Sequence, residues 1–216
     1  MGNSIQSKGT PAHELFTEVA QTPASLVSAR AALAAGALKG HRGTVRDATT
    51  AYLQAKLKTH HPDGVTPMPT QWVRLPRSWW PASWINPDGT AKFYDPVVRL
   101  KKALYGLKQA PRAWNQVLTT TLISLGFTPS SADPCLYTMI TPSGERIFMN
   151  TYVDDLFLAA KPSLDKDKII TGLSKAFAIT NLGIMTAPLG MEVTRNPLTG
   201  SVLLSQSKLA TALLSE

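Results

Sequence analysis

Apolar and polar positions are ordered most clearly between residues 135 and 160. Apolar runs at 147–149 and 156–160 enclose the sequence Tyr-Val-Asp-Asp at 152–155. Because such runs are typical of strands and Asp suits turns, the pattern predicts a β-hairpin with Asp154 and Asp155 at its tip. Side chains alternate along a strand, so the two carboxylates cannot both point into a core.

The same reading predicts the other regular elements. A short strand ends at Asp47 and leads into a helical or irregular segment. Further strands are predicted at 135–140 and 147–152, and a second hairpin over 191–205. The predicted helices are 23–40, begun by Thr22 and closed by Gly40, 111–125, closed by Gly126, and a segment capped by Ser163.

Residues 59–96 break this regular pattern. They hold nine Pro and Gly residues and four of the five Trp residues. We predict an irregular insertion with short strands near 72–75 and 91–94. Exposed Trp rings could stack on nucleic acid bases, but packing in the interior is the favoured role for Trp79, Trp80 and Trp84.

The composition fits one globular domain. The chain has 216 residues and 44% hydrophobic content, and the order of elements favours an α+β fold, an antiparallel sheet with helices packed on one face. The polar residues 1–12 are predicted to be a disordered tail, leaving 13–216 as the domain. A single cysteine excludes an internal disulfide, and no apolar run approaches the ~18 residues of a membrane span.

Basic charge adds a partner to this picture. The net charge is +8, which indicates that the protein binds a polyanionic partner. Between Lys92 and Arg112 there are six basic residues against one acid, Asp95. A merely solvated surface is the alternative, but the cluster leads into the segment 104–114, so contact with phosphates is favoured.

Three segments together resemble the reverse transcriptase domain of copia-type LTR retrotransposons. They are Asp-x-x-x-Ala-Tyr-Leu at 47–53, Leu-Tyr-Gly-Leu-Lys-Gln-Ala-Pro-Arg-Ala-Trp at 104–114, and Tyr-Val-Asp-Asp at 152–155, in the family's order. Shorter matches include Asp-Pro-Cys-Leu-Tyr at 133–137 and Leu-Gly-Met-Glu at 189–192. The resemblance covers residues 13–216 and is strongest from residue 97 onward.

The resemblance implies an RNA-directed DNA polymerase with a palm-like fold. In that reaction a primer 3′-hydroxyl attacks the α-phosphate of a nucleotide, and two Mg²⁺ ions, or Mn²⁺ in their place, stabilise the oxygens. The family pattern implies that Asp47 and Asp154 bridge both ions and that Asp155 assists. Such ions take oxygen ligands. An Asp-Asp turn without a metal is the alternative.

Further roles follow from the family's motifs alone. The implied nucleotide-binding residues are Ala48, Ala51, Tyr52, Gly106 and Lys108. Tyr52 would exclude a 2′-hydroxyl, unless it is a core aromatic. The implied template and primer contacts are Arg112, Tyr152, Gly190 and Met191. Met191 equally suits a core position.

The chain departs from the family at both ends. The family's basic fingers region is missing or replaced by residues 1–40, and the sequence stops at Glu216 before any thumb. We therefore expect a palm with partial fingers. The implied partners are an RNA or DNA template-primer, dNTPs and the other Pol polyprotein parts (fingers, thumb, RNase H, integrase), with no membrane. The implied location is intracellular, in a cytoplasmic particle and the nucleus.

Two other hypotheses remain open. One is a catalytically inactive, truncated nucleic-acid-binding remnant of the same element, which the basic charge supports equally well. The other is an unrelated acidic hydrolase or structural domain, and this would be favoured if Asp47 lay far from the hairpin tip.

Overall fold

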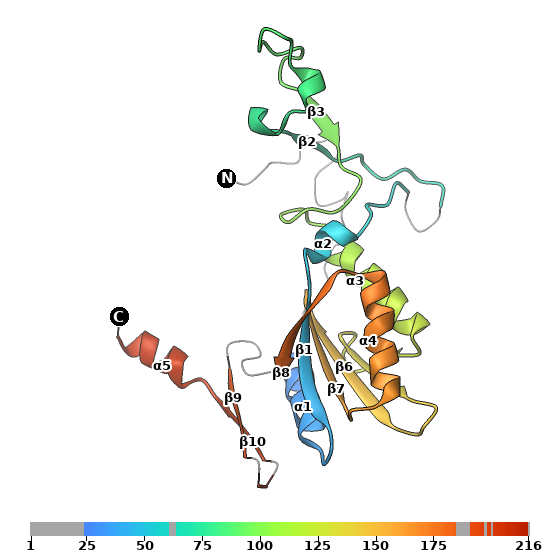
Figure 1. The fold of residues 1–216 in the computed structure, drawn as a ribbon, viewed down its shortest axis with the longest axis vertical. Coiled ribbons are helices and arrows are strands. Elements are labelled where there is room, and N and C mark those ends of the chain that lie inside the picture. The colour runs from blue at the N-terminus through green and yellow to red at the C-terminus, as the bar shows by residue number, and fades with distance from the viewer. Residues whose placement is uncertain (1–23, 61–63, 185–190, 197, 200, 216) are drawn as a thin grey trace. The chain divides into compact units, whose positions relative to one another are not determined.

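The computed structural model describes residues 24–60, 64–184, 191–196, 198–199 and 201–215 (Figure 1). The described residues form two compact units, one within 52–114 and the other within 24–51 and 115–215. The chain passes between them within α2 (Ala51–Gln54) and α3 (Ala110–Ser124). The predicted tail 1–12 lies outside the described residues. The helix predicted to be capped by Thr22 and to start at residue 23 begins later, because Ser25 caps it by accepting a hydrogen bond from the N–H of Ser28.

The second unit is built on a six-stranded antiparallel sheet in the order β4-β5-β6-β7-β1-β8. Its strands are β1 (Arg42–Ala48), β4 (Thr128–Pro129), β5 (Leu136–Ile140), β6 (Arg146–Tyr152), β7 (Asp155–Ala160) and β8 (Ile179–Ile184). The α+β class and the strands predicted at 135–140 and 147–152 are confirmed. The strand β8 was not predicted.

Helix α1 (Leu26–Ala37) covers one face of this sheet (Figure 1). Val45 of β1 and Phe157 and Ala159 of β7 form a buried cluster with it. Gly36 and Gly43 allow this close approach, because a Cβ atom on Gly36 would lie 3.1 Å from the Cα of Gly43. The α1 members of the cluster are Ala32, Leu33 and Ala35.

Helices α3 and α4 (Leu164–Ala176) lie on the opposite face. The Thr119 hydroxyl of α3 is 2.8 Å from that of Tyr137 on β5, and Tyr137 pairs with Met149, whose neighbour Asn150 contacts α1. Burial lowers the pKa of Arg46, and Asp167 in the first turn of α4 opposes this shift. The expectation that the helices share one face therefore holds for α3 and α4 but not for α1.

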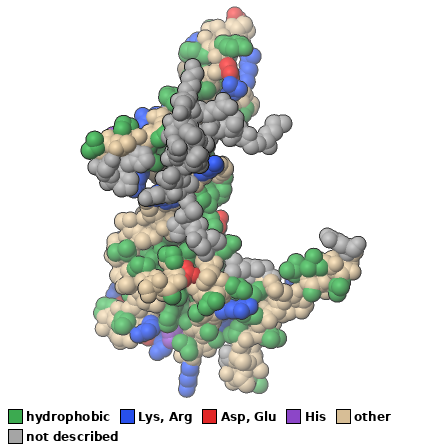
Figure 2. Space-filling model, turned by 180° about the vertical axis from the view of Figure 1, so that it is seen from behind, with side chains coloured by type: hydrophobic (Ala, Val, Ile, Leu, Met, Phe, Trp, Pro, Cys, Tyr) green, Lys and Arg blue, Asp and Glu red, His purple; other side chains and the backbone are tan. Residues whose placement is uncertain are grey.

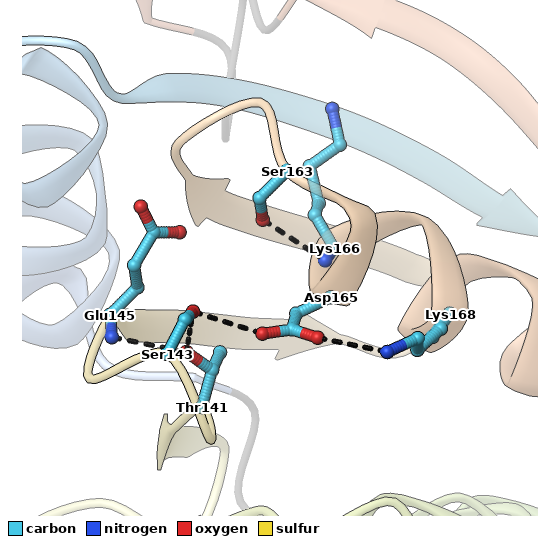
Figure 3. Close-up of polar contacts among 7 residues, drawn as sticks. All are labelled: Thr141, Ser143, Glu145, Ser163, Asp165, Lys166 and Lys168. Carbon is cyan, nitrogen blue, oxygen red and sulfur yellow. Dashed lines mark hydrogen bonds and ion pairs between the residues drawn. The ribbon is translucent and has the colours of Figure 1, made fainter.

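The start of α4 is tied to the turn between β5 and β6 (Figure 3). Ser163 caps the helix, as predicted, by accepting a hydrogen bond from the backbone N–H of Lys166 at 3.3 Å. Asp165 accepts from the Ser143 hydroxyl at 3.0 Å and pairs with Lys168 at 3.2 Å. Acidic groups are favourable in the first helical turn, and the hydrogen bond from Ser143 joins the start of α4 to this turn.

Three elements follow the sheet along the chain. The predicted hairpin over 191–205 is confirmed as β9 (Glu192–Arg195) and β10 (Val202–Ser205). Its Val193 and Leu204 pack against the α1 cluster, and Arg195 donates to the Gly36 carbonyl at 3.0 Å. Helix α5 (Ser207–Leu214) comes last. Among the described residues, no helix is both long and apolar enough to cross a membrane.

The first unit contains a two-stranded ribbon and short 3₁₀ turns. The strands are β2 (Trp72–Arg74) and β3 (Val97–Arg99), and the turns are η1 (Arg77–Trp79) and η2 (Ala82–Trp84). The strand predicted near 91–94 is wrong, because only Ala91 forms a bridge there, with Ile85. The interior role predicted for Trp79 is also wrong, since it is 72% exposed.

Candidate active site

The sheet brings Asp47 and the hairpin carboxylates together. In the antiparallel register of β1 and β7, Asp47 is the direct partner of Asp155. Directly opposed residues on neighbouring strands project from the same face, with Cβ atoms about 4.5–5.5 Å apart. The two residues are 108 positions apart in sequence, so only the fold makes them neighbours. The condition that would have favoured an unrelated domain, a distant Asp47, is not met.

The hairpin tip is held by a tight two-residue turn. Tyr152 pairs with Asp155, which leaves Val153 and Asp154 as the central residues. Val153 has a φ of +56°, and a positive φ at this position matches the twist of the two strands. For a β-branched residue this conformation is strained. The Ala48 N–H donates to the Asp154 carbonyl at 2.7 Å, which fixes the tip to the end of β1.

The three carboxylates repel one another. Partial burial raises the pKa of Asp155, and the charges of Asp154 and Asp47 raise it further. Both effects disfavour the charged carboxylate. Within the described ranges, no Lys or Arg forms an ion pair with any of the three. A bound cation would relieve this repulsion.

This donor set fits a hard divalent cation. Mg²⁺ prefers carboxylate oxygens and is usually held by one or two of them together with substrate phosphates. In the described part of the chain, no group of three or more His, Cys, Asp or Glu side chains is already arranged around a metal position. The chemistry of the site therefore suits an ion that substrate phosphates help to bind.

The other candidate residues of the second unit differ in how exposed they are. Ala48, which follows Asp47 in sequence, and Ala51 are fully buried, and Tyr152 is 36% exposed. The Met191 side chain is buried, which favours its core interpretation over contact with a primer. Gly190 lies outside the described residues.

Four candidate residues belong to the first unit, namely Tyr52, Gly106, Lys108 and Arg112. The Tyr52 ring lies 4.6 Å from that of Tyr105, measured between centroids. Gly106 has a φ of +90° and open space where a Cβ atom would be. Lys108 is exposed, and Arg112 is half-buried.

Sequence reasoning missed a buried polar network next to the hairpin. The Asp133 carboxylate accepts hydrogen bonds from the Ser28 hydroxyl at 2.5 Å, the Ser25 N–H at 2.9 Å and the Cys135 N–H at 2.8 Å. The Cys135 carbonyl in turn accepts from the N–H of Thr151 at 2.9 Å, one residue before Tyr152. The sequence signal was Asp-Pro-Cys, since Asp often bonds the backbone N–H two residues later.

Comparisons with known proteins give a family and several relatives. The model of the family described as "Reverse transcriptase (RNA-dependent DNA polymerase)" matches residues 83–216, more than half of the chain. No solved structure matches the chain significantly.

Curated relatives are transposon proteins. The chain is 35% identical over 112 residues to a retrovirus-related Pol polyprotein from transposon TNT 1-94 of Nicotiana tabacum. It is 37% identical over 103 residues to that from transposon RE2 of Arabidopsis thaliana. These matches cover 52% and 48% of this chain but only 8% and 7% of the two polyproteins. A putative Ty5-1 protein of Saccharomyces cerevisiae is 35% identical over 46% of this chain and 32% of its own length.

Proposed function

Because the chain belongs to the reverse transcriptase (RNA-dependent DNA polymerase) family, we propose that it supplies the catalytic palm of a copia-type Pol polyprotein. In this proposal Asp47, Asp154 and Asp155 catalyse transfer of a nucleotide to a primer. The observation that carries the proposal is the pairing of Asp47 with Asp155, beside a backbone hydrogen bond from Ala48 to Asp154. The resemblance to copia-type elements is confirmed by relatives that are transposon Pol polyproteins.

The chain's own residues would divide the work as follows. Asp47 and Asp154 would hold two Mg²⁺ ions, or Mn²⁺, with Asp155 as a weaker ligand. Such ions, when bound, stabilise the attacking and leaving oxygens of an in-line displacement at phosphorus. Asp47 sits on a strand with neighbours on both sides, β7 and β8. The carboxylates are therefore oriented before substrate arrives, and little reorganisation is needed during the reaction.

Three further residues would select and orient the nucleotide. Tyr52 would block a 2′-hydroxyl, Gly106 would admit the nucleotide close to the backbone, and Lys108 would contact its phosphates. Arg112 and Tyr152 would contact template and primer. The proposed partners are an RNA or DNA template-primer, dNTPs and the other Pol polyprotein parts, in a cytoplasmic particle and the nucleus.

The test is Mg²⁺-dependent extension of a labelled primer on an RNA template. It should use this chain alone and a longer Pol segment that contains it. Asp154→Asn and Asp47→Asn should each lower extension by about 100-fold or more, because charge stabilisation in the transition state is lost. The matched control is Asp165→Asn, an equivalent change at a carboxylate on α4, which should leave extension unchanged.

Two results would count against the proposal. Extension by Asp154→Asn at the unaltered rate would overturn the assignment of the carboxylates. A longer segment that binds template-primer but never extends it would favour the inactive remnant. The proposed ions have a separate readout, because Mg²⁺ should raise the melting temperature of the unaltered chain more than that of Asp154→Asn.

A further inference from the structure

One side chain of the edge strand β8 lies in the same row as the carboxylates of the candidate active site. Thr180 is the direct partner of Asp47 on one side of β1, as Asp155 is on the other. Directly opposed residues on neighbouring strands project from the same face of a sheet, with Cβ atoms about 4.5–5.5 Å apart. The Thr180 side chain therefore shares a face with the two carboxylates and is next to Asp47.

A β-bulge in β8 sets which of its residues faces Asp47. Val45 of β1 pairs with Gly183. The next residue, Arg46, pairs with Asn181, so one residue of β8 is passed over. Gly183 has a φ of +83°, which favours glycine, and its N–H donates to the Asn181 side chain at 3.0 Å. The sequence of β8 therefore supplies both the glycine and the side-chain acceptor of this bulge.

The bulge decides on which face Thr180 lies. Without it, Thr180 would pair with Ala48 and project from the side of the sheet opposite to Asp47, because a one-residue change of register moves every side chain to the other face. Bulges are frequent next to active sites, where they re-aim a side chain. The side chain that this bulge brings beside the carboxylates is that of Thr180.

The Thr180 hydroxyl has a second hydroxyl beside it. Oγ1 of Thr49 is 3.2 Å from Oγ1 of Thr180, and either group can be the donor. The Thr49 N–H donates to the Ala178 carbonyl at 3.0 Å, which continues the pairing of β1 with β8 beyond Ala48. Both threonines are exposed. Because a hydroxyl has one proton and two acceptor positions, Thr49 can donate to Thr180 while Thr180 donates to a third group.

An uncharged donor suits this position. In the parts of the chain that the structure describes, no Lys or Arg forms an ion pair with Asp47, Asp154 or Asp155. A basic side chain there would attract the carboxylates and compete with a metal ion, whereas a hydroxyl can donate to a phosphate oxygen and leave the carboxylates to the ion. Charged residues make up 17% of the chain, and on the face drawn in Figure 2 tan and green surface is more extensive than blue and red. Hydroxyl groups are therefore candidate donors to an anionic substrate.

We propose that the Thr180 hydroxyl donates a hydrogen bond to a phosphate oxygen of the nucleotide's triphosphate, and that Thr49 orients this hydroxyl. The inference rests on the proposed function, because a divalent ion at Asp47 brings the triphosphate to this face. Mg²⁺ is held by carboxylates and substrate phosphates together. A phosphate that shares the ion with Asp47 therefore lies beside the next residue of the row, which is Thr180. Thr180 contacts the substrate, and Thr49 is a positioning residue.

The test is calorimetric titration of the full chain, and of the longer Pol segment, with dTTP and Mg²⁺ in the absence of primer. Thr180→Val removes the hydroxyl and keeps a β-branched side chain, so the strand is retained. It should weaken dTTP binding about tenfold, because one hydrogen bond to a charged group is lost. Thr180→Ser keeps the hydroxyl and should retain most of the affinity. Inorganic tripolyphosphate, which has no base or sugar, should lose affinity for Thr180→Val by the same factor.

The matched control is Thr128→Val, the same substitution at an exposed threonine on β4, the opposite edge strand of the sheet. It should leave the affinity for dTTP unchanged. Kinetics of the longer segment give a second readout, in which Thr180→Val should raise the KM for dTTP about tenfold and change kcat much less. A lower kcat at an unchanged KM would instead mean that the hydroxyl acts on Asp47, and this would overturn the phosphate contact.

The results separate this inference from the proposed function. Unchanged dTTP affinity in Thr180→Val, with or without a lower melting temperature, would show that the hydroxyl only fastens β8 to β1 and would overturn the inference. Equal loss in Thr128→Val, or no dTTP binding by either the chain or the longer segment, would also overturn it. A protein that binds dTTP through Thr180 but never extends a primer refutes only the catalytic proposal.

Discussion

Replacing Asp133 by Asn should weaken the second unit substantially. The Asp133 carboxylate is 7% exposed and accepts three hydrogen bonds, two of them from Ser25 and Ser28 at the start of α1. The Asn side chain has one oxygen and one NH₂ group, so the NH₂ group would face at least one of the three hydrogen-bond donors. The Ser25 N–H cannot accept a hydrogen bond from it. The Ser28 hydroxyl can rotate, so one contact is recovered.

The magnitude follows from the bonds that are lost. A hydrogen bond to a charged group contributes about 1.5–3 kcal/mol, and a buried donor without a partner costs about 1–3 kcal/mol. A carboxylate near a helix N-terminus adds about 0.3–1 kcal/mol. We expect Asp133→Asn to lower the free energy of unfolding by about 3 kcal/mol at neutral pH. Urea unfolding followed by circular dichroism measures this change.

The pH dependence of the change tests its cause. Burial raises the pKa of Asp133, but the bonds from Ser28, Ser25 and Cys135 together lower it below its ordinary value. A depressed pKa stabilises the fold above the ordinary Asp value of about 3.9, and this contribution is lost as the pH falls through the folded pKa. The difference between the two proteins should therefore shrink at acidic pH. A difference that is small at pH 7, or that persists in acid, would refute the reasoning.

Four further outcomes can be measured by the same unfolding experiment. Val153→Gly should raise the free energy of unfolding by about 1 kcal/mol, because relief of strain at φ +56° exceeds the added backbone entropy of glycine. Gly43→Ala should lower it by about 1–3 kcal/mol, because the new Cβ would lie 2.7 Å from the buried ring of Phe157. In EDTA, stability should fall as the pH rises from the ordinary Asp value toward the raised pKa of Asp155, since a raised acid pKa favours the folded state only while the group is protonated. Asp155→Asn should abolish that fall, and an unchanged pH profile would show that burial and the neighbouring carboxylates do not raise the pKa of Asp155.

The sequence predicted those helices and strands in which apolar positions recur regularly or a capping residue is present. The apolar positions over residues 111–125 predicted α3, and Ser163 predicted the start of α4. The strand β8 was missed because most of its residues are exposed and Gly183 interrupts it with a φ of +83°. Little in its side chains distinguishes it from a loop, and pairing with β1 alone makes it a strand.

The predictions that were wrong or missing concern residues whose positions depend on tertiary contacts. The Ala-rich sequence of α1 has no continuous polar face, so it does not indicate which sheet face the helix covers; the glycines at 36 and 43 do. Trp79 and Trp80 are adjacent and chemically identical, but Trp80 donates to the Leu75 carbonyl and Trp79 is exposed. The Asp133 network joins residues more than 100 positions apart. Patterns within a short window cannot show such contacts.

Asp47 and Asp155 are like charges that lie directly opposite each other on the sheet, and their repulsion destabilises the second unit when no cation is bound. A fold selected only for stability would gain from separating the pair, because like charges directly opposed cost free energy. A divalent cation between the carboxylates would relieve this cost, and the proposed function requires such a cation. Stabilisation by Mg²⁺ that is lost in Asp155→Asn would show that the two carboxylates are kept together for their ligand.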